Sequence, residues 1–237
     1  KRAAVLVLEI LLGHIPLSLL SESLAGEEPE PREEPKPKQE AAEARPRIVY
    51  LDLETQKSAQ DVGGWHNTHL MRISVAVLFD DRENRFLSFT EDRIDDLVAR
   101  LEKADLVVGF NIKRFDYAVL GAYTGKDLKT IRTFDMLEDV YRRLGFRIGL
   151  DHLAAETLNQ RKSGDGLQAL EWFKQGDMEK LTEYCRHDVE ITRDLFLYGC
   201  RNGHLIYRKK QEDQRMRLLV DWKLVDLVRH KPRVEPS

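Results

Sequence analysis

The chain has 237 residues, of which 42% are hydrophobic and 33% are charged, and its formal net charge is −3. This supplies enough apolar side chains for the core of one ordinary domain. Its apolar runs are shorter than the ~20 residues that cross a membrane. Two cysteines, 15 residues apart in one expected helix, exclude a disulfide framework. We therefore expect a cytoplasmic protein with no membrane contact.

The first 46 residues separate into an apolar helix and a spacer. Residues 2–12 have a helical pattern that stops at Gly13, which predicts a helix within residues 1–25. Glu9, His14 and Pro16 interrupt the apolar run, which disfavours a secretory signal. Residues 27–44 contain four prolines, and seven acids against three bases give this stretch a net charge of −4. This composition predicts a disordered linker at 26–46.

The folded domain is expected at 47–220, followed by a basic tail at 221–237. Strands are predicted at 47–54, 69–80, 84–90 and 105–110, with a short strand near 131–134. Helices are predicted at 91–104, 114–123, 136–144, 151–159, 166–174 and 177–200, and a weak hairpin joins 204–209 to 215–220. Strands mixed with helices in this order indicate an α/β fold with one central sheet.

Asp52 and Glu54 form the first unusual pair. They lie two residues apart on the apolar strand 47–54, so they point to the same face. If that face is covered, two like charges repel and are poorly solvated, and a divalent cation relieves both problems. The alternative is a strand end that reaches solvent, with Glu54 on the surface.

Asp188 and Asp116 interrupt apolar helix faces in the same way. Asp188 lies within the apolar stripe of helix 177–200, four residues after Tyr184 and on the same side. A carboxylate there needs an arginine or a metal. Asp116 shares a face with Val119 and Leu120, although an acid is also favoured near a helix N-terminus. Asp135 and Asp151 precede helices and are expected to be N-caps.

Together these residues form an ordered set of three motifs. The segments are DLET at 52–55, GFNIKRFDYAVL at 109–120 and YCRHDVEIT at 184–192. The set resembles the acidic 3′–5′ exonucleases that share their fold with the proofreading domains of DNA polymerases, and a similar group is the bacterial predicted exonucleases of the RNase H-like type. It looks like the branch with tyrosine in the third motif, because the histidine of the other branch falls where this chain has Glu183. The resemblance covers residues 47–200.

The resemblance implies a fold, a chemistry and a substrate. The fold is an RNase H-like mixed central sheet flanked by helices. Asp52, Glu54, Asp116 and Asp188 hold two Mg²⁺ or Mn²⁺ ions, about 3.5–4 Å apart. Tyr184 orients the attacking water, and Thr55 and Asn111 border the terminal nucleotide. The substrate is DNA or RNA with a 3′ end. Thr55 and Asn111 also have structural interpretations, as a strand-end hydroxyl and as a cap of the next helix.

Two other functions remain open at this stage. One is a catalytically inactive RNase H-like module that binds nucleic acid, which the complete five-residue set disfavours. The other is a structure-specific endonuclease that uses the same metals. The segment KRAAVLVLEILLG also resembles the last helix of the C-terminal region of some superfamily 2 DNA helicases. This resemblance implies that residues 1–25 are the end of an upstream helicase-like domain, a partner in the same natural chain, and that residues 26–46 tether it to the folded domain.

Overall fold

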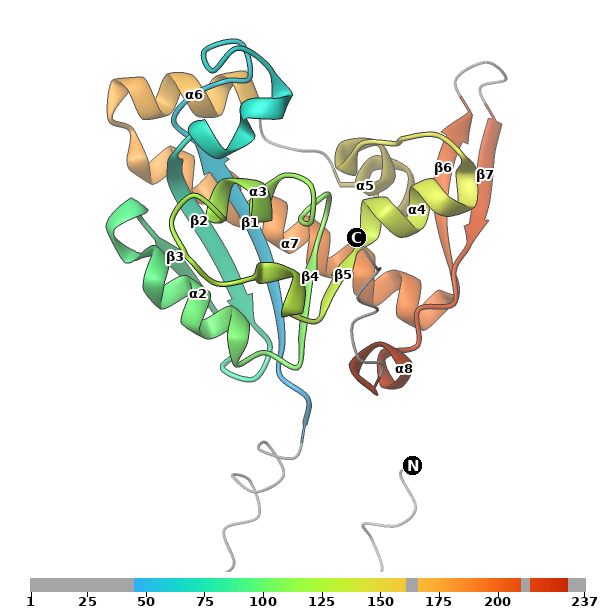
Figure 1. The fold of residues 1–237 in the computed structure, drawn as a ribbon. Coiled ribbons are helices and arrows are strands. Elements are labelled where there is room, and N and C mark those ends of the chain that lie inside the picture. Colours follow the sequence, from blue (N-terminus) through green and yellow to red (C-terminus); the bar gives the residue numbers. More distant parts are fainter. Residues whose placement is uncertain (1–44, 161–165, 210–213, 230–237) are drawn as a thin grey trace, which may run out of the picture. The chain divides into compact units, whose positions relative to one another are not determined.

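The computed structural model describes residues 45–160, 166–209 and 214–229. The expected helix at 1–25, and the linker except for residues 45 and 46, lie outside the described residues. A five-stranded mixed sheet forms the centre of the described part, in the order β3-β2-β1-β4-β5 (Figure 1). Its strands are β1 (Ile48–Thr55), β2 (Ile73–Asp80), β3 (Arg85–Phe89), β4 (Leu106–Gly109) and β5 (Thr133–Asp135). The expected α/β class with one mixed central sheet is confirmed.

β1 is the central strand and pairs in both directions. It runs antiparallel to β2 and parallel to β4, and β4 runs parallel to β5. Its side chains alternate as the sequence predicts. Val49, Leu51 and Leu53 pack into the core on one face, whereas Ile48 and Tyr50 pack into the core on the other. Asp52 and Glu54 lie on the Tyr50 face because side chains two residues apart share a face.

Helices cover both faces of the sheet. On the Leu51 face lie α2 (Ile94–Glu102), entered through the 3₁₀ turn η2 (Glu91–Arg93), then α3 (Asp116–Leu120) and the 3₁₀ turn η3 (Leu128–Thr130). On the Tyr50 face the long helix α7 (Met178–Asn202) crosses β1 and β2. Around it are α4 (Met136–Leu144), α5 (Leu150–Leu158) and α6 (Gly166–Gln175) (Figure 1).

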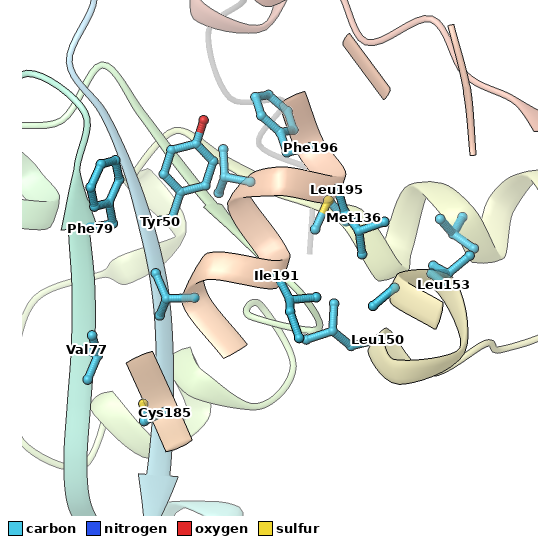
Figure 2. Close-up of a cluster of buried hydrophobic side chains, with 14 of the residues drawn as sticks. Tyr50, Val77, Phe79, Met136, Leu150, Leu153, Cys185, Ile191, Leu195 and Phe196 are labelled. Carbon is cyan, nitrogen blue, oxygen red and sulfur yellow. The ribbon is translucent and has the colours of Figure 1, made fainter. Parts of the chain in front are cut away.

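The core on the Tyr50 face fixes the position of α7. Figure 2 shows Ile191 and Leu195 of α7 directed toward Met136, Leu150 and Leu153 of α4 and α5. Phe196 approaches the ring of Tyr50 with a centroid distance of 5.9 Å. α7 is therefore held between the sheet on one side and α4 and α5 on the other. Burial of this much apolar surface makes it a rigid support for the polar residues on its first half.

Beyond α7 the chain forms the hairpin of β6 (His204–Lys209) and β7 (Gln214–Leu219), as expected, and then α8 (Leu224–Arg229). Trp222 lies beyond the boundary expected at residue 220, yet it is buried. Its indole Nε1 donates a hydrogen bond of 2.7 Å to Asp139 Oδ2, and its ring stacks on Phe196. The start of the expected basic tail is therefore part of the domain core.

Several element boundaries differ from the sequence predictions. β2 starts at Ile73 instead of residue 69, because residues Trp65–Leu70 form the 3₁₀ turn η1. The expected helix at 114–123 is reduced to α3. The N-cap of α5 is Gly149, so the expectation that Asp151 is an N-cap is wrong. Asp151 lies in the first turn of the helix, where its negative charge interacts favourably with the positive end of the helix dipole. No helix among the described residues is both long and apolar enough to cross a membrane.

Candidate active site

β1 supplies Asp52 and Glu54 at the end of its ladder. Both side chains are partly buried. The pairing with β2 shifts between Glu54 and Thr55, so that Glu54 faces Val75 and Thr55 faces Ile73, with Ser74 left between them. Such a bulge changes the direction in which the following chain leaves the sheet. The alternation that points Asp52 and Glu54 to one side therefore ends at Glu54.

α7 supplies Asp188 and Tyr184 from its buried face. Asp188 is only 2% exposed and Tyr184 only 3% exposed. Cys185, between them in the sequence, lies against β1, where its Sγ is 3.4 Å from the Asp52 carbonyl oxygen. Burial, followed by the negative charge of Asp52, raises the pKa of the Cys185 thiol, so the thiol remains neutral. A small neutral side chain here allows α7 to approach β1 closely.

Three of the predicted ligands meet at this crossing. Carboxylate oxygens of Asp52, Glu54 and Asp188 all lie within 4.8 Å of one another. The Tyr184 ring lies one helical turn from Asp188 and packs edge-on against Trp172 of α6, with a centroid distance of 5.7 Å. Packing on α6 therefore restricts the Tyr184 ring beside the carboxylates.

Asp116 is the fourth predicted ligand, and the charges of Asp52 and Glu54 act on its carboxyl. It is the first residue of α3 and is 2% exposed. Its Oδ1 is buried and accepts no hydrogen bond from any residue that the structure describes. Burial, followed by the negative charge of Asp52, raises the pKa of the Asp116 carboxyl well above its usual range. A buried carboxylate oxygen next to other carboxylates requires a proton or a cation.

Asp135 organises the loop that precedes Asp116. As expected, it caps α4, accepting hydrogen bonds from the backbone N–H groups of Leu137 and Glu138. It also accepts from the backbone N–H groups of Asn111, at 2.9 Å, and Lys113, at 3.1 Å. The sequence did not predict this second role, because it depends on β4 and β5 ending side by side.

A cleft of about 400 Å³ opens beside Asp52. Its lining includes Asn111, Arg147 and Asp151. Asn111 has a left-handed backbone, with φ of 67°, and its side-chain Oδ1 accepts a hydrogen bond of 3.0 Å from Arg147 Nη2. Arg147 was missed from the sequence, where a single arginine in a short segment between two helices carries no recognisable signal.

Thr55 does not line this cleft. Its hydroxyl is buried and donates to the carbonyl oxygen of Lys57 at 2.9 Å. This contact fits the interpretation of Thr55 as a strand-end hydroxyl. Asn111 lines the cleft and also has a structural role. Its carbonyl oxygen accepts a hydrogen bond from the backbone N–H of Phe115, just before α3 begins.

The family model of the RNase H superfamily matches residues 49–198, well over half of the chain. The chain therefore belongs to the RNase H superfamily. Among solved structures, it is similar to the family B DNA polymerase from the hyperthermophilic archaeon Pyrobaculum calidifontis, with 16% sequence identity and a TM-score of 0.48. The match covers 66% of this chain and 25% of the polymerase chain, so the chain corresponds to a quarter of that protein. No curated protein sequence matches the chain.

Superfamily membership and the acidic cluster agree on a general class of activity. The cluster of Asp52, Glu54 and Asp188 fits a divalent-metal site in an RNase H-like fold. Oxygen-only ligands of this kind suit hard cations. The chain thus has the features of a nuclease, a hydrolase that acts on nucleic acid.

Proposed function

We propose that the chain is a metal-dependent 3′–5′ exonuclease. The observation that carries the proposal is the convergence of Asp52, Glu54 and Asp188 within 4.8 Å, with the buried Asp116 beside them. The direction of hydrolysis rests on the order of the three sequence motifs and on Tyr184 in the third. DNA and RNA with a free 3′ end are both candidate substrates.

The proposal assigns two Mg²⁺ or Mn²⁺ ions to these carboxylates. Asp52, Glu54 and Asp188 bring carboxylate oxygens within 4.8 Å of one another, and the buried Asp116 Oδ1 has no hydrogen-bond donor among the described residues. Asp52, Glu54, Asp116 and Asp188 would hold the ions. When bound, such ions lower the pKa of a water molecule and stabilise the oxygen that leaves from phosphorus.

The other side chains have separate tasks in this proposal. The Tyr184 hydroxyl orients the water that attacks the terminal phosphodiester. Asn111 borders the terminal nucleotide, and Thr55 contributes mainly by holding the end of β1. Arg147 lies next to Asn111 in the cleft, where its guanidinium can pair with a phosphate of the substrate.

End-labelled oligonucleotides test this proposal. Single- and double-stranded DNA and RNA, labelled at the 5′ end, are incubated with the full chain and Mg²⁺ or Mn²⁺. We expect ladders that shorten by one nucleotide at a time, and no products in EDTA. A circular single strand of the same polymer should remain intact, because it has no 3′ end.

The two alternative functions give different results in the same assay. Cleavage of the circle would identify an endonuclease and contradict the exonuclease assignment. Binding of the oligonucleotides without any metal-dependent cleavage would indicate the inactive binding module. Either outcome would leave the RNase H-like fold unchanged and would overturn the proposed activity.

A further inference from the structure

Trp65 is the most exposed tryptophan among the described residues. It is the first residue of η1, in the loop between β1 and β2, and it is 72% exposed. The other two tryptophans pack against the domain, Trp222 in the core and Trp172 against Tyr184. A large aromatic ring kept at the surface gains little from folding and is a common feature of binding sites.

The loop that carries Trp65 has a defined conformation. Its ends are joined by backbone hydrogen bonds from Gln56 to Arg72 and from Lys57 to Met71. Gly63 and Gly64 have φ of 82° and 125°, values that a side chain would strain. The Asn67 side chain donates to the Val62 carbonyl oxygen at 2.8 Å. The position of Trp65 is therefore determined by the fold and does not depend on a partner.

The Trp65 ring contacts the segment that leads into Asp116. The Trp65 ring packs edge-on against Phe115, with a centroid distance of 6.2 Å. Phe115 immediately precedes Asp116, and its backbone N–H is bonded to Asn111 at the cleft. These contacts connect Trp65 through Phe115 to Asn111, which lines the cleft.

Positive charge accompanies this loop. Hydrogen bonds from Ser58, followed by the positive charges of Lys174 and Lys57, lower the pKa of the Asp61 carboxyl. Lys57 and Lys174, which come from the loop and from α6, are both exposed. Lys174 also pairs with Glu171 at 3.4 Å. Aromatic side chains and positive charge are the features of surfaces that bind single-stranded nucleic acid, and this loop offers the exposed ring of Trp65 and the exposed Lys57.

We propose that Trp65 stacks on a base of a single-stranded nucleic acid whose 3′ end lies at the carboxylates. The proposal rests on the proposed exonuclease function and adds the preference for an unpaired strand. Stacking uses the face of any base, so it selects single strands without selecting a sequence. A base in a duplex must unpair before it can make the same contact.

Binding of a labelled strand tests the role of Trp65. The full chain is titrated against 5′-fluorescein-labelled 12-nucleotide oligothymidylate and oligouridylate, with Ca²⁺ in place of Mg²⁺, and Kd is measured by fluorescence anisotropy. We expect Trp65→Ala to raise Kd by about 5- to 150-fold for the polymer that wild type binds more tightly. Trp65→Tyr should restore most of the affinity, because it keeps an aromatic face.

A neighbouring exposed side chain provides the matched control. Leu70 ends the same turn η1 and is 49% exposed. Leu70→Ala should leave Kd unchanged, and both variants should melt at the wild-type temperature. A series of oligonucleotides each lacks one base, at a position that moves stepwise away from the 3′ end. At one position in this series, Trp65→Ala and wild type should have the same Kd, because the base that Trp65 stacks on is missing. Equal Kd values for wild type and Trp65→Ala would overturn the proposal.

A small substrate separates this proposal from the proposed function. The p-nitrophenyl ester of thymidine 5′-monophosphate has no upstream base to stack. We expect wild type and Trp65→Ala to hydrolyse it at the same rate with Mn²⁺. If wild type cleaves oligonucleotides and Trp65→Ala cleaves them equally well at low concentration, only the stacking role fails. If wild type cleaves neither substrate, the exonuclease function fails and the stacking proposal falls with it.

Discussion

Tyr184 and Asp188 share one face of α7, four residues apart, yet they have different expected roles. Tyr184→Phe keeps the ring and its contact with Trp172 and removes only the hydroxyl. We expect folding and metal affinity to be unchanged and the single-turnover rate to fall about 10²–10³-fold, because one positioning hydrogen bond is lost at the transition state. Asp188→Ala should remove nearly all activity and weaken Mn²⁺ binding, measured by calorimetry.

The control for this pair is the stability of each variant in urea. A Tyr184→Phe protein that cleaves at the wild-type rate would show that Tyr184 is only a core aromatic. The carboxylate assignment could then still stand. An active Asp188→Ala protein would contradict both the assignment of the carboxylates as metal ligands and the role of Tyr184.

Asp116 illustrates the conflict between stability and function at a single residue. In EDTA, burial and then the charge of Asp52 raise the pKa of the Asp116 carboxyl, so its ionised form is disfavoured in the folded protein. Asp116→Asn should therefore raise the free energy of unfolding, and more so as the pH rises above the usual pKa of aspartate. The same variant should lose activity and the stabilisation that Mn²⁺ gives to wild type. Urea unfolding with and without Mn²⁺ measures both effects.

Asp135→Asn is the matched control for Asp116→Asn. Asp135 is also buried, but its oxygens accept backbone hydrogen bonds from Asn111, Lys113 and Leu137. Its substitution should lower the free energy of unfolding by roughly 1–3 kcal/mol. A destabilised Asp116→Asn protein in EDTA would contradict the account of Asp116 as an uncompensated charge.

At the scale of elements, periodicity predicted most of what forms the site. The alternation of β1 and the apolar stripe of α7 follow directly from the sequence, and both faces are buried as expected. The β1–β2 loop and the segment with Arg147 were not predictable. Their geometry depends on glycine backbone angles and on contacts between distant residues, such as the 36-residue separation of Arg147 and Asn111.

The end of α7 connects the site helix to the C-terminal segment. A Cβ on Gly199 would lie far inside van der Waals contact with the Trp222 ring. Gly199→Ala should therefore lower the free energy of unfolding by about 1–3 kcal/mol, through displacement of Trp222 from Phe196 and Asp139. Gly125→Ala, where a Cβ meets nothing within 4 Å, serves as the control in thermal melting. A Gly199→Ala protein as stable as wild type would show that Trp222 is not fixed there.

At the scale of the whole molecule, the described domain is expected to fold without its N-terminal segment. The backbone N–H of Arg47 donates to Asp105 Oδ2 at 2.7 Å, and its guanidinium pairs with the buried Asp80. These contacts begin at the first strand and involve only the domain. A fragment of residues 45–237 should unfold cooperatively at the urea midpoint of the full chain. Limited proteolysis should cut within 26–46. Loss of cooperative unfolding in the fragment would assign residues 1–44 to the core.

The position of the label on a single-stranded oligonucleotide tests the central claim most directly. The assay uses Mn²⁺ and an excess of the 237-residue chain over the oligonucleotide. A 3′-labelled strand should release labelled mononucleotide in the first turnover, whereas a 5′-labelled strand should give a ladder of progressively shorter products. Asp52→Asn and EDTA should abolish both products. Labelled mononucleotide released first from the 5′ end, or undiminished products in EDTA, would contradict metal-dependent 3′–5′ hydrolysis at the carboxylate cluster.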